Sequence, residues 1–231
     1  MKHVMFMASG AALVAASSAI AGVPSSAAAF EVPSFRGDTN TQYAGWESFA
    51  TPIGFNNPTD PATTNFGAGV VQDVAPDFSM PPGVLITSAG NLYSGFQIIN
   101  VGVLAGSGNG QDLTDVTLQV RTLGTELDTA GVVLIDTDAF GPPIPVIPAA
   151  TTELFRQSDS PIFPGFPSEI VETRFDFNLT GLGISNFVIG LPQQQAHISF
   201  DRIELDTAFV PTPGALAVLG VAGLTAVRRR R

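Results

Sequence analysis

Side chains able to do hydrolytic chemistry are sparse in the central part of this sequence. A serine nucleophile needs a histidine base, and the chain has two histidines. His3 lies in the N-terminal segment, so His197 is the only histidine of the central region, at the start of an expected strand. No G-x-S-x-G sequence marks a nucleophile elbow. The sequence therefore predicts no catalytic residues and no enzyme, and a lone histidine at a strand edge is typical of a structural or solvated side chain.

Acidic residues occur in pairs that could serve a glycosidase or bind a cation. Glycoside hydrolysis needs two carboxylates in one cleft, and calcium binds carboxylate oxygens in flexible loops. The pairs are Asp136 with Asp138, Glu169 with Glu172, and Asp112 with Asp115. The first pair follows an expected strand, and "GSGNGQDLTD" offers oxygen ligands, yet neither matches the EF-hand pattern. We expect no metal site and no cofactor, with calcium as the cation to test; solvated turn residues explain the same pattern.

Three aromatic side chains are candidates for a carbohydrate-binding groove. Trp46, Tyr43 and Tyr93 could stack on sugar rings if a sheet exposes them. A single tryptophan in a β-sandwich is also typical of the core, so both interpretations stay open.

The composition bounds the class of protein and of partner. The chain has 231 residues, of which 45% are hydrophobic and 13% charged, and no cysteine, which favours one globular domain without disulfides. All 20 acidic residues lie between Glu31 and Asp206, with five arginines and no lysine, a difference of −15. Such a charge repels phosphate groups and predicts no nucleic-acid partner. The five interior arginines are Arg36, Arg121, Arg156, Arg174 and Arg202.

Hydrophobic residues alternate with polar ones at a period of two, which predicts strands. In "IVETRFDFNL", Val171, Thr173, Phe175, Phe177 and Leu179 share one face, and in "VTLQVRT", Val116, Leu118 and Val120 do. "LYSGFQII" and "AGVVLID" read as more buried strands, and "HISFDRIEL" as the last one. In this last strand the alternation of apolar and polar residues changes phase part-way along. A bulge near Asp201 and Arg202 would keep the apolar residues on one face.

The connections between these strands are rich in glycine and proline, as in "SMPPG" and "FGPPIPVIPAA". Proline there argues against central strands and helices. Many short strands with such loops predict an all-β fold, an antiparallel β-sandwich with jelly-roll-like connectivity over residues 30–209. Seventeen phenylalanines suit a core filled from two inner sheet faces.

The N-terminal segment has the three parts of a secretory signal peptide. Lys2 and His3 precede an apolar run that ends in small residues. We expect a signal peptide over residues 1–21 with cleavage near Ala21, and cleavage at Ala29 as the second choice. The chain is then exported.

The C-terminal segment "VPTPGALAVLGVAGLTAVRRRR" combines a proline step, an apolar run and four arginines. The thirteen uncharged residues of positions 215–227 would span about 20 Å as a helix, less than the roughly 30 Å hydrocarbon core. The arginines would stay on the cytoplasmic side during export. We expect a short hydrophobic helix that inserts transiently into the membrane.

This segment resembles the PEP-CTERM sorting signal of Gram-negative bacteria, in the "PTPGA…RRRR" form of the planctomycete type. Pro211 and Pro213 match the two prolines of the family's pattern, and residues 215–227 match its hydrophobic helix. The resemblance implies a sorting signal made of Pro211, Thr212, Pro213, Gly214 and the basic end Arg228, Arg229, Arg230 and Arg231. Thr212 departs from the glutamate that names the family. The resemblance covers residues 210–231 and implies removal of the tail by an exosortase-like enzyme, after signal peptidase has removed the leader. It also implies delivery to the cell surface, the outer envelope or the extracellular matrix, often beside exopolysaccharide.

Three functions follow as hypotheses of different classes. The first is an exported, non-catalytic surface or matrix protein that is sorted through its tail. The second is a jelly-roll carbohydrate-binding module with weak glycan affinity. The third is an enzyme on the same scaffold, which would need convergent carboxylates with a shifted pKa.

Overall fold

A computed structural model of the chain describes residues 30–50, 70–73, 84–94, 101–108, 110–138, 145–158 and 169–210. Within these ranges the chain forms strands and a single 3-10 turn, η1 (Thr129–Gly131). The expected signal peptide, 1–21, and the expected sorting segment, 211–231, lie outside the described residues. No helix in the described part of the chain is long and apolar enough to cross a membrane.

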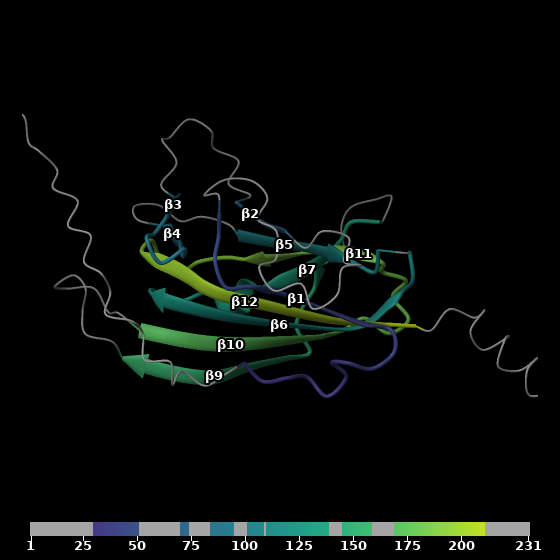
Figure 1. Cartoon of the computed structure of the whole chain (residues 1–231). Helices are drawn as coiled ribbons and strands as arrows, with labels where there is room; N and C mark the ends of the chain where they lie inside the picture. Colours follow the sequence, from purple (N-terminus) through teal and green to yellow (C-terminus); the bar gives the residue numbers. More distant parts are fainter. Residues whose placement is uncertain are drawn as a thin grey trace, which may run out of the picture.

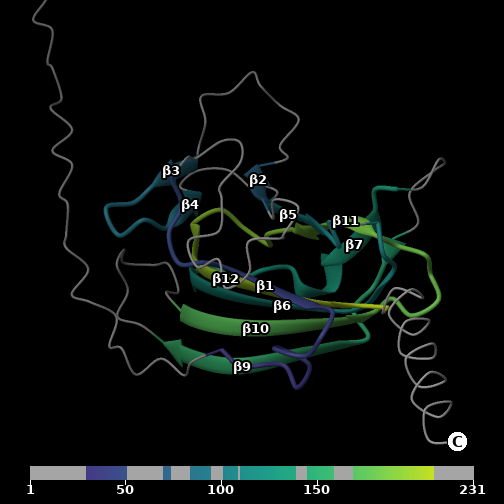
Figure 2. The ribbon, with the colours of Figure 1, turned by 45° about the vertical axis from the view of Figure 1, so that its right-hand side comes forward.

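The strands form two antiparallel sheets that lie as two layers (Figures 1 and 2). The larger sheet has the order β3 (Val84–Ile86), β4 (Leu92–Ser94), β12 (Ile198–Phe209), β6 (Leu113–Gly124), β10 (Glu169–Asn178), β9 (Ala150–Ser158), and β1 (Thr41–Trp46) also pairs with β12. The smaller sheet has the order β2 (Val70–Asp73), β5 (Val101–Gly106), β11 (Asn186–Leu191), β7 (Val133–Asp136), β8 (Pro145–Val146). The all-β prediction is confirmed, and the arrangement is consistent with a β-sandwich.

The hydrophobic core lies between the two sheets. Phe175 and Phe177 of β10 and Phe200 of β12 fill it from the larger sheet, and Phe187 of β11 fills it from the smaller one. Each of these rings is almost completely buried. Aromatic side chains supply large apolar area per residue, so a few of them account for much of the stabilisation.

The period-two patterns identify the core faces correctly. Val116, Leu118 and Val120 of β6 are buried in the core, as are the alternating phenylalanines of β10. The bulge expected in the last strand is also present, because the pairing of β12 with β6 shifts register between Phe200 and Arg202. Asp201 is the extra residue, and it lets Phe200 and Ile203 both reach the core.

The prolines of the loop "FGPPIPVIPAA" do not exclude every strand. Pro145 belongs to β8, which pairs only with β7 at the edge of the smaller sheet. An edge strand tolerates proline because one side of it needs no donor for a ladder bond.

Candidate functional site

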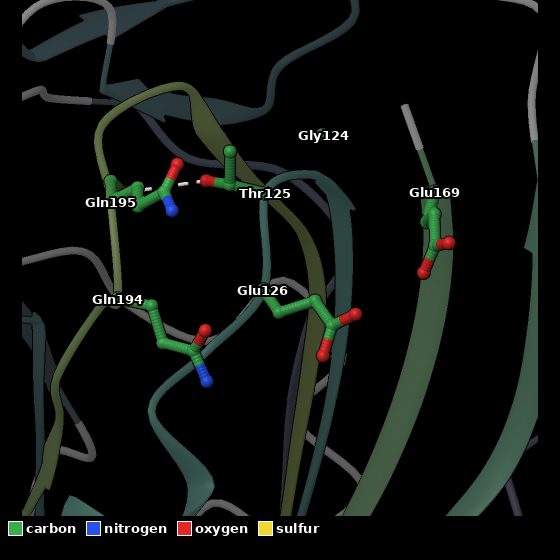
Figure 3. A pocket seen from close by; sticks show the side chains of 6 residues that line it. All are labelled: Gly124, Thr125, Glu126, Glu169, Gln194 and Gln195. Carbon is green, nitrogen blue, oxygen red and sulfur yellow. Dashed lines mark hydrogen bonds between the residues drawn. The ribbon is translucent and has the colours of Figure 1, made fainter. Parts of the chain in front are cut away.

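A small pocket opens at the end of the larger sheet where β6 ends and β10 and β12 begin. Its volume is about 150 Å³. The lining residues are Gly124, Thr125, Glu126, Glu169, Gln194 and Gln195. Gly124 pairs with both Glu169 and Ile198, which brings the three strand ends together. Figure 3 shows that the side chains of Glu126, Glu169 and Gln194 border the same space.

Arg156 of the neighbouring strand β9 gathers the carboxylates near this pocket. Its Nη1 lies 2.6 Å from Oε1 of Glu126 and also contacts Glu169, and its Nη2 lies 2.7 Å from Oε2 of Glu153. The hydrogen bond from Arg156 holds the pKa of Glu126 below its usual range, and the same contact lowers the pKa of Glu153. Both groups are therefore ionised at neutral pH, and the pocket offers acceptors and amides suited to neutral hydroxyl groups.

The expected pair Glu169 and Glu172 does not share a cleft. The two residues are three positions apart in a strand, so their side chains point to opposite faces of the sheet. Glu169 lies at the pocket, whereas Glu172 is fully buried on the other face and bonds Arg121 at 2.5 Å. A two-carboxylate site built from this pair is excluded by that geometry.

His197 directly precedes β12, next to the strand start at which it is expected. It adopts a φ of 71°, and its Nδ1 lies 3.0 Å from the hydroxyl of Tyr93. Its backbone N–H donates to the backbone carbonyl of Ser94, and its own carbonyl accepts the backbone N–H of Thr125. These contacts give His197 a structural role, joining β4 to the end of β6.

The aromatic candidates do not form a sugar-stacking platform. Trp46 is completely buried in the core, and Tyr43 is buried beneath the guanidinium of Arg36. Tyr93 is half-buried and bonded to His197. The stacking interpretation is wrong for Trp46 and Tyr43, because neither ring face is open to a ligand.

Asp138 uses its carboxylate to tie two loops together. It accepts hydrogen bonds from the backbone and side chain of both Ser185 and Asn186, at 2.7–2.9 Å. Burial alone would raise its pKa, but these bonds lower it. Asp136 in turn accepts the N–H of Asp138.

Among the described residues no group of three or more His, Cys, Asp or Glu side chains could hold a metal ion. Asp112 is exposed and Asp115 lies in β6, and the expectation of no metal site, with calcium as the cation to test, stays a prediction.

A second polar cluster, which the sequence did not reveal, covers the other face of the larger sheet. We call it the outer polar face: Glu172, Arg174 and Asp176 of β10, Thr117, Gln119 and Arg121 of β6, Arg202, Glu204 and Asp206 of β12, and Tyr43 of β1. The strand register aligns these residues in rows. Four of the five interior arginines contact this face, which explains where the scarce positive charge of the domain is used.

Residues 30–38, which we call the N-terminal arm, lie over the outer polar face. The ring of Phe30 lies 5.7 Å from the guanidinium carbon of Arg121 and 5.0 Å from that of Arg202. The carbonyl of Glu31 accepts from Nε2 of Gln119 at 2.8 Å. Cation–π contacts of this kind contribute about 0.5–2 kcal/mol each. The arm is the reason that polar positions of β6 and β12, which would otherwise face solvent, are buried.

Arg36 anchors the other end of the arm. Its Nη2 lies 2.7 Å from Oε2 of Glu204, and its Nε lies 2.5 Å from Oδ1 of Asp206. The guanidinium carbon lies 4.0 Å from the centroid of the Tyr43 ring. Burial raises the pKa of Asp206, although the bond to Arg36 acts in the opposite direction. The face thus holds one guanidinium between two carboxylates and an aromatic ring.

Comparison with known proteins gives no match to a family model, to a curated protein or to a solved structure.

Proposed function

We propose that the chain is an exported, non-catalytic protein of the cell surface or extracellular matrix, sorted through residues 210–231. The observation that carries the proposal is the order of a proline step, an apolar run and an arginine cluster directly after the folded domain. Strand β12 ends at Phe209, and the N–H of Val210 donates to the backbone carbonyl of Asp112 at 2.9 Å. Pro211 follows at once, and proline keeps a chain extended for a processing enzyme.

Strand β12 separates the pocket from the start of the sorting segment. This strand runs from Ile198, beside the pocket, to Phe209, where the sorting segment would begin. Twelve residues of strand span roughly 40 Å. A domain held at its C-terminal end would therefore present the pocket away from the point of attachment.

Processing of the tail is the direct test. Intact-mass spectrometry of the protein purified from its native host should show a chain that ends near Pro213, without the apolar run and the arginines. A variant in which Pro211 and Pro213 are both changed to alanine should keep the tail, because the segment can then continue as helix. A mature wild-type chain that still carries Arg231 would contradict the proposal.

The second candidate is a carbohydrate-binding module, and the polar pocket is the observation that favours it. Its amides and ionised carboxylates suit neutral hydroxyl groups. We expect weak, millimolar binding of neutral oligosaccharides in an NMR titration, because no aromatic ring lines the pocket. Changing Gln194 and Gln195 to alanine should abolish the shifts, and changing the exposed Gln157 of β9 should not. Shifts that persist in the double variant would exclude this pocket as the site.

We also propose that the two sheets are connected as in a jelly roll. It is supported by the alternation of consecutive strands between the two sheets, since β5, β6 and β7 alternate, and β10, β11 and β12 do so again.

A further inference from the structure

The N-terminal arm is held by side chains and can leave the sheet as a unit. Its backbone hydrogen bonds are turns within the arm, from Arg36 N to Pro33 O and from Asp38 N to Phe35 O. The arm joins β1 through Gly37, at a φ of 94°, and Asn40, at a φ of 69°. Rotation within this turn can swing the arm outward without breaking the pairing of β1 with β12.

The outer polar face is built as a receptor for a specific segment. A face that only needed covering would be more stable with apolar residues, because buried ion pairs cost about as much in desolvation as they return. This face instead has separate sites for a ring, between Arg121 and Arg202, and for a guanidinium, between Glu204 and Asp206. The ligand it recognises is a segment with an aromatic residue, a turn that begins at Pro33, and an arginine six positions after the aromatic residue.

The fit between arm and face is incomplete. Oε2 of Glu172, Oε1 of Gln119 and Nε of Arg202 are buried without a hydrogen-bond partner among the described residues. A buried polar atom left without a partner costs about 1–3 kcal/mol. Burial also raises the pKa of Glu172, against the effect of Arg121. The arm in place therefore satisfies the face only in part, which lowers the cost of releasing it.

The charge of the molecule restricts the partner that can bind in place of this arm. The domain is strongly acidic, and the arginines of the sheet already contact carboxylates. The sheet surface of a second copy would therefore be repelled by Glu204 and Asp206. The arm of a second copy, however, carries the same Phe30 and Arg36.

We infer that the outer polar face exchanges N-terminal arms between copies of this chain, so that the arm of one molecule binds the sheet of the next. Exchange of an identical element conserves every contact and costs little free energy. A short tether gives the arm an effective concentration in the millimolar range, so exchange is favoured only where copies are crowded. Crowding in a surface layer rests on the proposed function, but the exchange itself does not.

Cross-linking of paired cysteine variants tests the exchange, because the chain has no cysteine of its own. Nη1 of Arg174 lies 3.2 Å from Oε2 of Glu31, at an accessible position of the arm and face. The full-length Glu31→Cys and Arg174→Cys variants are mixed at about 1 mM and treated with a short bismaleimide. We expect a cross-linked dimer whose yield rises with concentration, several-fold above the yield from Glu31→Cys mixed with Gln157→Cys.

The double variant, with both cysteines in one chain, is the internal reference. It should give an intramolecular link at low concentration and linked oligomers at high concentration. Intramolecular links in the double variant together with no excess dimer in the mixture would overturn the exchange. No link of either kind would overturn the contact of the arm with the face as well. Neither result depends on the processing of the tail, so failure here leaves the proposed sorting untouched.

Discussion

Replacing Arg36 by alanine is expected to lower the free energy of unfolding by about 3 kcal/mol, because the buried carboxylate of Asp206 loses its direct ion-pair partner and that of Glu204 keeps only Arg202. The side chains of Glu204 and Asp206 are only 3% and 0% exposed. Removing one partner of a buried ion pair leaves the other charge desolvated without compensation. Urea denaturation, followed by circular dichroism, measures the loss.

Arg156→Ala is the matched control for this prediction. Arg156 contacts three carboxylates where Arg36 contacts two, but its own side chain is 35% exposed and those of its partners are 26–46% exposed. Exposed ion pairs contribute about 0–1 kcal/mol. The same chemistry should therefore cost several-fold less at Arg156 than at Arg36. Equal losses in the two variants would show that Arg36 acts through something other than burial of its partners.

The pH dependence of the Arg36→Ala deficit gives a second readout. Burial already raises the pKa of Asp206 in the native protein, and loss of Arg36 removes an interaction that lowers it. A carboxyl whose pKa is raised by folding contributes stability below its unfolded pKa, near 4, and loses it as pH rises through the folded value. The deficit should therefore be smaller at pH 4 than at pH 7. A purely steric effect of the substitution would not change with pH.

The parts of the fold that the sequence predicts are those in which one face of a strand is apolar. The alternation in β10 and β6 identifies the core residues, and the change of phase at Asp201 locates the bulge. The signal is weaker in other strands. In β5 and β11 the core residues alternate with glycine, valine and leucine instead of polar residues, so no polar face marks the strand. The strand β9 is exposed along most of its length, and β1 mixes Gln42, Gly45 and Trp46.

The outer polar face could not be predicted, because its residues come together only through pairing of distant strands. Arg121 and Glu172 are 51 positions apart, and Arg36 and Asp206 are 170 apart. Each strand alone reads as a half-buried strand with a solvated polar side. The one available signal was compositional, since all interior positive charge is arginine and an arginine fork suits paired carboxylates better than lysine.

The pocket was missed for a similar reason. Its residues are common surface types from four loops and strand ends, and only the register of β6 with β10 and β12 assembles them. Of the expected candidates only Glu169 lies at the pocket, and the sequence pairs it with Glu172, which lies on the other face of the sheet. His197 and Trp46 stand out by the rarity of their residue types, and they join and fill the fold.

Replacing Gly124 by alanine is expected to cost about 3 kcal/mol or more, and it should remove the pocket together with the strand end that shapes it. Gly124 adopts a φ of 94°, and an added Cβ would lie 2.2 Å from the carbonyl oxygen of His197. That oxygen is backbone and accepts the N–H of Thr125, so it cannot move without breaking the junction.

Gly181→Ala is the control that separates the cost of the left-handed backbone from the cost of the contact between the added Cβ and His197. Gly181 has a φ of 80°, yet an added Cβ there would meet nothing within 4 Å. The left-handed conformation alone costs an alanine about 1–2 kcal/mol, which is the whole loss expected at Gly181. The excess at Gly124 then measures the contact with His197, and urea denaturation of both variants gives it directly. If the two variants lose the same stability, the junction of β6 with β12 yields to the added methyl group, and the contact with His197 does not fix the shape of the pocket.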